Sequence, residues 1–260
     1  MNSEGVAGLG VVVTGAASGI GAALARRLAV EGARVVVNDR AAEGAQRVAA
    51  EVGGLAVPGD AASVDGVVHL VAAARHHLGE IDIFFANAGV GGDLGLDCPE
   101  DAWESAWQVN VMAHVRAARA LVPAWVARGR GHFVATVSAA GLLTMPGAAP
   151  YAVTKHGALA FAEWLAISYA DRGVTVQAVC PLGVRTPMLA AAGAYGEAVL
   201  GRDAISAEQV AHRVVESLAG GPFLILPHPQ VARFYADRAA DPDGWQAATR
   251  RLLANLPTPP

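Results

Sequence analysis

The sequence predicts a doubly wound α/β fold, a parallel sheet of about seven strands with helices on both faces. Two observations support this prediction. Short β-branched runs alternate with alanine- and leucine-rich segments of helix length, and these runs are apolar throughout, without polar alternation. Strands covered on both faces have this character, and a helix between each pair of strands makes the sheet parallel.

The composition predicts one domain over residues 1–260 and a small-molecule partner. The 260 residues are 53% hydrophobic and 16% charged, enough for one large core, and show no repeat or linker. A net charge of −4 without basic blocks argues against nucleic acid or a membrane surface as a partner. With no signal peptide and no apolar run of about 20 residues, we expect a cytoplasmic protein.

The predicted strands follow one another at intervals that leave room for a helix. They cover residues 10–14, 34–39, 55–60, 81–87, 132–138, 174–179 and 223–226. From about residue 227 onward we predict a helical extension that covers a site or joins subunits. Its expected apolar anchors are Phe234, Tyr235, Trp245, Leu252 and Leu253.

A glycine-rich segment, "TGAASGIG", follows the first strand and opens a helix. Gly15, Gly19 and Gly21 would let a pyrophosphate rest on backbone amides at the positive end of that helix. The spacing is wider than G-x-G-x-x-G, and glycines here also fit a plain strand-to-helix turn.

Asp39 ends the second predicted strand, in "VVVNDRA". A carboxylate there accepts hydrogen bonds from the adenosine ribose and repels a 2′-phosphate, which favours NAD over NADP. Arg40 is a complication, because a guanidinium beside the acid could pair with that phosphate. A solvated residue at the end of a strand is the other interpretation of Asp39.

Two further polar segments end predicted strands. Asp60 closes the third strand, where it accepts from the adenine amino group or caps the helix that begins near Ser63. "NAG", Asn87 to Gly89, ends the fourth strand at the sheet edge where open α/β sheets bind ligands, although it also fits a simple turn.

Tyr151 and Lys155 are four residues apart in "YAVTK" and lie on one helix face. A nearby ammonium favours the phenolate, and the positive charge of an oxidised nicotinamide would add to this effect, so Tyr151 could exchange protons near neutral pH. Ser138, at the end of the fifth strand, could hold the substrate oxygen. In isolation the same pattern also fits an amphipathic helix with a snorkelling lysine.

Taken in order, "TGAASGIG", "NAG", Asn110, Ser138 and "YAVTK" resemble the short-chain dehydrogenase/reductase family up to about residue 190. The resemblance implies a Rossmann domain in which Ser138, Tyr151 and Lys155 are catalytic. Asn110 would complete a tetrad from a helix irregularity, ordering a water in a relay to Lys155, which also binds the nicotinamide ribose. The cofactor contacts implied or expected are Gly15, Ser18, Gly19, Ile20, Gly21, Asp39, Asp60, Ala61, Asn87, Ala88, Gly89, Tyr151, Lys155, Pro181, Val184 and Thr186.

The sequence departs from the family in the segment "CPLGVRTPM". Pro181 is present, but Leu182 stands where the family usually has glycine, and Val184 and Thr186 stay in register for the nicotinamide carboxamide. If that position needs a positive φ, the backbone of Leu182 is strained. Alternatively, the loop has shifted and Gly183 adopts the turn conformation with positive φ. The usual C-terminal motif, which often builds tetramer contacts, is also replaced, although a homodimer or homotetramer is still expected.

Apolar segments after Ser138 and at residues 188–200 are the expected walls of the substrate pocket. Such a pocket fits an apolar secondary alcohol or ketone, cyclic or aromatic ones included, and the second segment suggests a mobile lid. Each wall residue equally fits a packed surface helix. Besides Ser138 and Tyr151, the expected substrate contacts are Leu142, Leu143, Met145, Met188, Leu189 and Tyr195.

We therefore expect an NAD-dependent oxidoreductase acting on an apolar alcohol or ketone, with Tyr151 as general acid/base. The alternatives are an NADP-dependent carbonyl reductase and a non-catalytic, NAD-binding redox sensor. Dehalogenation and enoyl reduction are disfavoured, since the resemblance associates them with arginine in place of the lysine or with a longer spacing. We predict no metal site, and we interpret Cys98 and Cys180 as reduced and structural.

Overall fold

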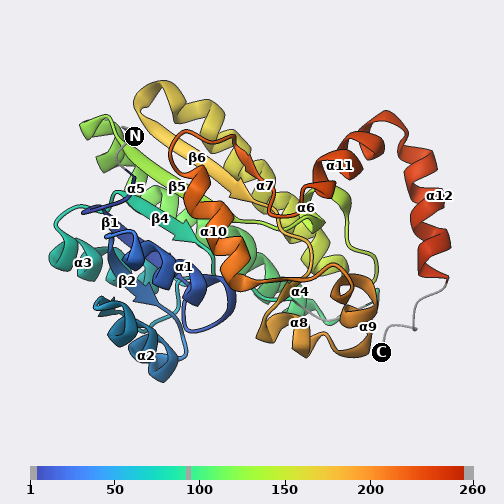
Figure 1. The fold of residues 1–260 in the computed structure, drawn as a ribbon, viewed down its shortest axis with the longest axis horizontal. Helices are drawn as coiled ribbons and strands as arrows, with labels where there is room; N and C mark the ends of the chain where they lie inside the picture. The colour runs from blue at the N-terminus through green and yellow to red at the C-terminus, as the bar shows by residue number, and fades with distance from the viewer. Residues whose placement is uncertain (1–4, 92–94, 255–260) are drawn as a thin grey trace.

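The computed structural model describes residues 5–91 and 95–254, and its centre is a seven-stranded sheet (Figure 1). The strand order is β3-β2-β1-β4-β5-β6-β9, and every pairing in this sheet is parallel. This confirms the predicted doubly wound fold, with the strand order reversing between β1 and β4. The strands are β1 (Gly10–Thr14), β2 (Arg34–Asn38), β3 (Leu55–Ala56), β4 (Ile83–Ala86), β5 (Gly131–Thr136), β6 (Val174–Val179) and β9 (Leu224–Ile225).

Several strands end earlier than predicted, and turns built on polar side chains follow three of them. Asp39, Asp60 and Ser138 each lie beyond their strand. Each side chain accepts a hydrogen bond from the backbone N–H two residues later, at 2.9, 2.9 and 3.1 Å respectively. Such turns take the backbone out of the strand ladder. The three residues therefore sit in loops at the sheet edge.

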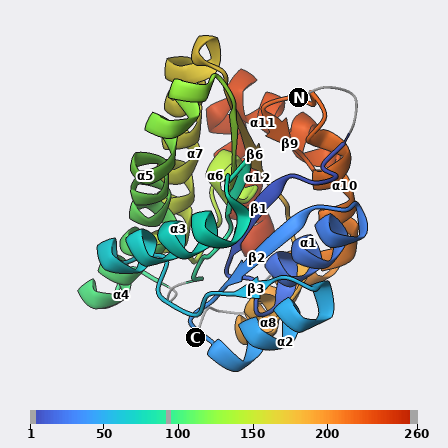
Figure 2. The same ribbon diagram turned by 90° about the vertical axis from the view of Figure 1, so that its left-hand side faces the viewer.

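Helices cover both faces of the sheet (Figure 2). Helices α1, α2 and α10 lie on one face, and α3, α5 and α7 lie on the other. Val11 and Val13 of β1 point into the first layer and Val12 into the second, so the strand has no polar face. The helices are α1 (Gly19–Val30), α2 (Ala42–Val52), α3 (Val64–Leu78), α4 (Glu100–Trp107), α5 (Ala113–Arg128), α6 (Ala140–Leu143), α7 (Ala149–Tyr169), α8 (Pro187–Ala191), α9 (Gly193–Gly196), α10 (Ala207–Ser217), α11 (Gln230–Ala240) and α12 (Pro242–Leu253).

A small second sheet is formed by the part of the chain between β6 and α10. It pairs β7 (Val184–Arg185) with β8 (Ile205–Ser206), and α8, α9 and a π-helical turn at Glu197–Gly201 connect the two strands. A capping box between Ser206 and Gln209 then starts α10. The segment expected to form a lid is thus held at both ends by strand pairing.

Helices α11 and α12 form the predicted C-terminal extension, and α12 stands away from the sheet (Figure 1). The rings of Phe234 and Trp245 lie 6.2 Å apart and join the two helices. Tyr235 and Leu252 are 42% and 61% exposed, so the prediction that they are anchors is wrong. The fully buried anchor of α11 is Val231 instead. Among the residues that the structure describes, no helix is long and apolar enough to cross a lipid bilayer.

Candidate active site

The predicted site residues gather at the carboxyl edge of the sheet. Gly15 follows β1, Asp39 follows β2, Asn87 follows β4, Ser138 follows β5 and Pro181 follows β6. Parallel strands bring these five positions to one edge, and the strand order reverses at β1 and β4, where such folds bind ligands.

The glycine loop approaches neighbouring backbone too closely for side chains. A Cβ on Gly15, whose φ is 64°, would lie 2.7 Å from the Cα of Ala88, and a Cβ on Gly21 would lie 2.3 Å from the carbonyl oxygen of Gly15. Gly19 also has a positive φ, of 53°. Ser18 precedes α1 without a side-chain capping bond, so the first amides of α1, from Gly19 and Ile20 onward, remain available. These features fit the backbone cradle that a pyrophosphate requires.

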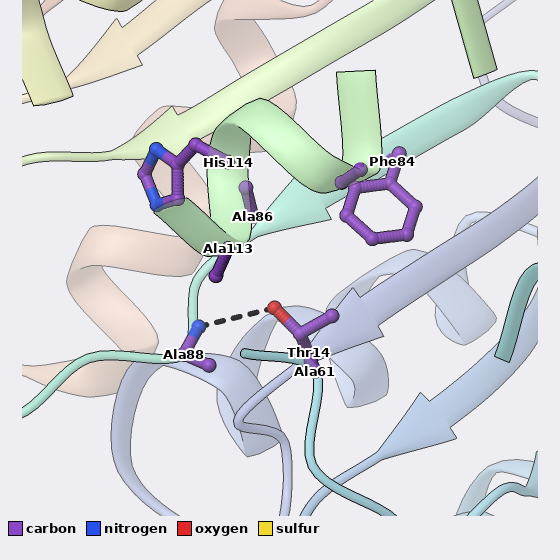
Figure 3. A pocket seen from close by; sticks show the side chains of 8 residues that line it. Thr14, Ala61, Phe84, Ala86, Ala88, Ala113 and His114 are labelled. Atoms are coloured by element: carbon purple, nitrogen blue, oxygen red, sulfur yellow. Dashed lines mark hydrogen bonds between the residues drawn. The ribbon is translucent and has the colours of Figure 1, made fainter. Parts of the chain in front are cut away.

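Thr14 fastens the "NAG" turn to the end of β1 (Figure 3). Its hydroxyl donates to the carbonyl oxygen of Phe85 at 3.1 Å and accepts from the N–H groups of Asn87 and Ala88 at 3.0 and 3.1 Å. The Asn87 amide donates to the Thr14 carbonyl oxygen at 2.9 Å and accepts from the Thr136 hydroxyl at 3.0 Å. Neither threonine is among the residues predicted from the sequence, although each is a hydroxyl residue at the last position of a buried strand.

Asp39 lies directly beside the glycine loop. One carboxylate oxygen accepts from the N–H of Ala17 at 3.0 Å, and the other accepts from Ala41. Asp60 was one candidate for the cap of α3, and it does not cap that helix. The Ser63 hydroxyl is the cap, accepting a hydrogen bond from the N–H of Gly66 at 2.9 Å. Ser63 is the cap because it immediately precedes the first helical turn.

Ser138, Tyr151 and Lys155 come together at the start of α7. The Ser138 hydroxyl lies close enough to Tyr151 to lower the pKa of its phenol. The Lys155 ammonium lies 5.6 Å from the centre of the Tyr151 ring and donates to the carbonyl oxygen of Thr136 at 2.9 Å. Lys155 is only 3% exposed. The three predicted catalytic side chains therefore form one cluster.

Burial shifts the pKa of both titratable groups in this cluster. Burial raises the pKa of Tyr151, and the Ser138 hydroxyl opposes the shift. Burial lowers the pKa of Lys155 to about 8. The expected lowering of the Tyr151 pKa is therefore not found in the protein alone. Desolvation of the phenolate prevails over the effect of Ser138, and the lysine donates its hydrogen bond to the Thr136 carbonyl oxygen.

Asn110 lies in a π-helical turn, Gln108–Met112, between α4 and α5. Its amide donates to the Val90 carbonyl oxygen and the Thr154 hydroxyl and accepts from the Val90 N–H, each at 3.0 Å. The asparagine is fully buried, and these bonds offset the desolvation of its amide. The helix irregularity implied by the resemblance is present, and it joins the segment after the "NAG" turn to α7.

The loop after β6 contains neither of the two turns considered from sequence. Neither Leu182 nor Gly183 has a positive φ, so leucine is not strained and glycine does not replace it in that role. Gly183 is required for another reason: a Cβ there would lie 2.2 Å from the Leu200 carbonyl oxygen. Thr186 caps α8. It also lies against the glycine loop, because a Cβ added to Gly19 would lie 3.2 Å from the methyl carbon of Thr186.

The expected substrate walls divide into two groups. Leu142, Leu143 and Tyr195 are buried, and the two leucines belong to the hydrophobic core, so they do not form an open wall. Met188 is 43% exposed and lies opposite Gly91, where a Cβ would be 4.0 Å from the methionine side chain. Met145 and Leu189 are partly buried. The accessible apolar surface is thus contributed by the loop after α6 and by α8.

A small cavity with a volume of about 10 Å³ lies beneath this edge of the sheet, lined among others by Thr14, Ala61, Ala88 and His114 (Figure 3). His114 follows Asn110 by one helical turn and is only 1% exposed. Burial, together with the charge of Lys155, lowers the pKa of His114 to about 3, so its imidazole is neutral at physiological pH. His114 is not among the site residues predicted from the sequence.

Comparison with known proteins identifies the family. A family model described as short chain dehydrogenase matches residues 10–195. The chain belongs to this family. It therefore has the Rossmann-type fold of the short-chain dehydrogenases and is an oxidoreductase that acts on alcohols or ketones with NAD(P).

Individual family members resemble this chain over most of its length. A 1-deoxy-11-beta-hydroxypentalenate dehydrogenase of Streptomyces avermitilis is 37% identical over 239 residues, which cover 88% of each chain. A short chain dehydrogenase/reductase of Burkholderia phymatum, solved with NAD, has a TM-score of 0.86 and 26% identity, and the match covers 92% of this chain and 95% of that one. A 3-ketoacyl-(acyl-carrier-protein) reductase of Brucella melitensis, solved with NADH, has a TM-score of 0.76 and 28% identity, covering 85% and 96%.

Proposed function

We propose that this short-chain dehydrogenase transfers a hydride between NAD and an apolar secondary alcohol or ketone. The observation that carries the proposal is the cluster of Ser138, Tyr151 and Lys155 at the sheet edge that also holds the glycine cradle. This edge therefore offers a proton donor or acceptor, a polar group for the substrate oxygen and a place for a dinucleotide.

In the proposed mechanism, Ser138 holds the substrate oxygen and Tyr151 exchanges a proton with it. NAD, when bound in the glycine cradle, would supply the hydride acceptor and, in its oxidised form, a positive charge. That charge favours the phenolate and opposes the burial that raises the pKa of Tyr151 in the protein alone. Lys155 binds the nicotinamide ribose, and Asn110, fixed in its π-helical turn, positions the water that passes protons to Lys155.

Replacing Tyr151 by phenylalanine tests this mechanism. Tyr151→Phe keeps the ring beside Lys155 but removes the hydroxyl group that exchanges a proton with the substrate oxygen. We therefore expect a loss of activity of about 100-fold or more. The measurement is NADH absorbance during turnover of a panel of cyclic and aromatic secondary alcohols and ketones, with the affinity for NAD determined by calorimetry. NAD affinity should be retained. Equal activity of the variant and the wild type would exclude Tyr151 from the mechanism.

The proposed preference for NAD rests on the position of Asp39. Its carboxylate accepts from Ala17 in the glycine loop, at the place where the adenosine ribose of a dinucleotide fold lies. Two structural relatives were solved with NAD or NADH. A 2′-phosphate would meet the carboxylate, whereas free ribose hydroxyls would donate to it.

Replacing Asp39 by alanine tests the cofactor preference. We expect Asp39→Ala to weaken NAD binding about tenfold through loss of the ribose hydrogen bonds, and to narrow the discrimination against NADP. Glu43→Ala is a matched control, since Glu43 is an exposed acid nearby in the first turn of α2. If wild-type protein turned over NADP as efficiently as NAD, the preference would be overturned in favour of an NADP-dependent reductase.

The proposed substrate class follows from the accessible apolar side chains in the loop after α6 and on α8. Met145, Met188 and Leu189 offer apolar contact, and the Streptomyces relative is named as a dehydrogenase of 1-deoxy-11-beta-hydroxypentalenate. NAD binding without turnover of any apolar alcohol or ketone would instead favour the non-catalytic sensor.

A further inference from the structure

The side chain of His228 joins the C-terminal extension to the loop after β6. It lies just before α11 and is only 2% exposed. Its Nδ1 accepts a hydrogen bond from the N–H of Leu182 at 3.1 Å, and its Nε2 lies 3.2 Å from the carbonyl oxygen of Asp203. A backbone N–H can only donate and a carbonyl can only accept, so the proton is on Nε2 and the ring is neutral.

The environment of His228 favours this neutral tautomer. Burial lowers its pKa, and the neighbouring backbone of Asp203 and Gly183 and the charge of Asp203 oppose the shift only in part. A protonated ring would direct a second N–H at the N–H of Leu182 and break the bond. His228 therefore acts as an acceptor toward the loop.

The loop is held at three consecutive residues. The Pro181 carbonyl oxygen accepts from the N–H of Ala139 at 2.8 Å, and the Gly183 carbonyl oxygen accepts from the N–H of Ile205 at 3.1 Å. Between them, the N–H of Leu182 is the group that His228 satisfies. Without this acceptor the loop would carry an unpaired, partly buried donor, which is unfavourable.

The same loop borders both halves of the site. The Ser138 hydroxyl lies 3.5 Å from the Pro181 carbonyl oxygen, and Thr186 lies against Gly19 of the glycine loop. A shift of the loop would therefore change the distance between the catalytic serine and the cofactor cradle. Leu182 stands where the family usually has glycine, and the bond to His228 fixes the backbone at that residue.

We propose that His228 is a positioning residue for the nicotinamide end of the cofactor: it fixes the loop that carries Val184 and Thr186 through the backbone of Leu182. This inference rests on the proposed function, in which that loop contacts the nicotinamide. It assigns the C-terminal extension a role in the active site, because the extension supplies the acceptor that the loop requires.

Three substitutions separate the two hydrogen bonds of His228. His228→Asn retains an acceptor near the position of Nδ1, His228→Gln retains a donor near the position of Nε2, and His228→Phe retains neither. His132→Phe is the control, since His132 is an equally buried histidine in β5, at the opposite end of the strand from Ser138. Hydrogen exchange at the Leu182 amide, followed by NMR without cofactor, reports the bond directly. Calorimetry with NAD reports its consequence.

We expect the Leu182 amide to exchange about tenfold faster in His228→Phe and His228→Gln, and NAD affinity to fall by a similar factor, as for loss of one buried hydrogen bond. His228→Asn should restore both quantities, and His132→Phe should change neither.

The proposal is overturned if His228→Phe leaves Leu182 exchange and NAD affinity unchanged, or if His228→Gln restores them as well as His228→Asn does. If His228→Phe does not fold, the asparagine and glutamine variants decide the question alone. Failure of wild-type protein to bind NAD would sink the proposed function, whereas Leu182 exchange would still show whether His228 holds the loop.

Discussion

Thr144 ends α6, in the segment that leads from Ser138 to the substrate side, with a φ of 65° and a ψ of 133°. Among the described residues it is the one non-glycine residue with a positive φ. A β-branched side chain is strongly disfavoured in that region, and such strain amounts to about 1–3 kcal/mol. The local backbone is thus held by its surroundings against the preference of the threonine.

Replacing Thr144 by glycine should release this strain. We expect Thr144→Gly to raise the free energy of unfolding by about 1 kcal/mol. The relief of backbone strain exceeds the additional conformational entropy that the more flexible glycine chain loses on folding. Denaturant unfolding measures the change. Thr144→Ala is the matched control, because it keeps a Cβ and therefore the strain. A glycine variant no more stable than the alanine variant would show that the turn is unstrained.

At the scale of elements, α11 is tied to the helices that carry the site. The guanidinium of Arg238 donates to the carbonyl oxygen of Leu142 in α6 and lies 3.3 Å from Nε2 of His156 in α7. Nδ1 of His156 donates to the Ala152 carbonyl oxygen at 2.9 Å, which leaves Nε2 free to accept from the arginine. One side chain thus joins three helices around Ser138 and Tyr151.

Replacing Arg238 by methionine should loosen the substrate side of the site. We expect Arg238→Met to raise the KM for the alcohol about threefold to tenfold, since hydrogen bonds from a charged donor are lost, while NAD affinity stays unchanged. Arg233→Met is the control, because Arg233 lies on the same helix over the ring of Phe234 and is exposed. Equal KM values for both variants would leave Arg238 without a role at the site.

The sequence predicted these elements better than the contacts between them. Apolar β-branched runs are a local signal, so the order of strands and helices was predictable, and the glycine loop and Tyr151 carry motifs that are local as well. The bonds of His228 to Leu182 and of Arg238 to Leu142 join residues that are distant in the chain, so no local pattern announces them. For this reason the C-terminal extension is predicted only as helices that cover a site or join subunits.

At the scale of the whole molecule, the active site is also a determinant of stability. Lys155 is the only lysine in the 260 residues. It is buried with its ammonium on a carbonyl oxygen, and burial lowers its pKa from 10.5 to about 8. Buried charge that serves a cofactor destabilises the protein that lacks the cofactor.

The homodimer or homotetramer remains a prediction, for which exposed Trp164 and Ile167 on α7 offer an apolar surface.

Lys155 should make the stability of the cofactor-free protein depend on pH in a defined window. Below pH 8 the lysine is protonated in both states, whereas between pH 8 and 10.5 the unfolded chain holds a proton that the folded chain has released. Stability therefore rises with pH across this window, by up to about 1.4 kcal/mol per pH unit. Lys155→Met has no such proton, and subtracting its denaturation free energies removes the titration of groups that do not interact with Lys155; Cys180, whose pKa the lysine lowers, is replaced by alanine in both proteins. The difference between wild type and variant should thus be constant below pH 8 and shift in favour of the wild type up to pH 10.5. Parallel stability curves through this window would show that the lysine keeps its ordinary pKa in the folded protein and that its burial imposes no penalty on the empty site.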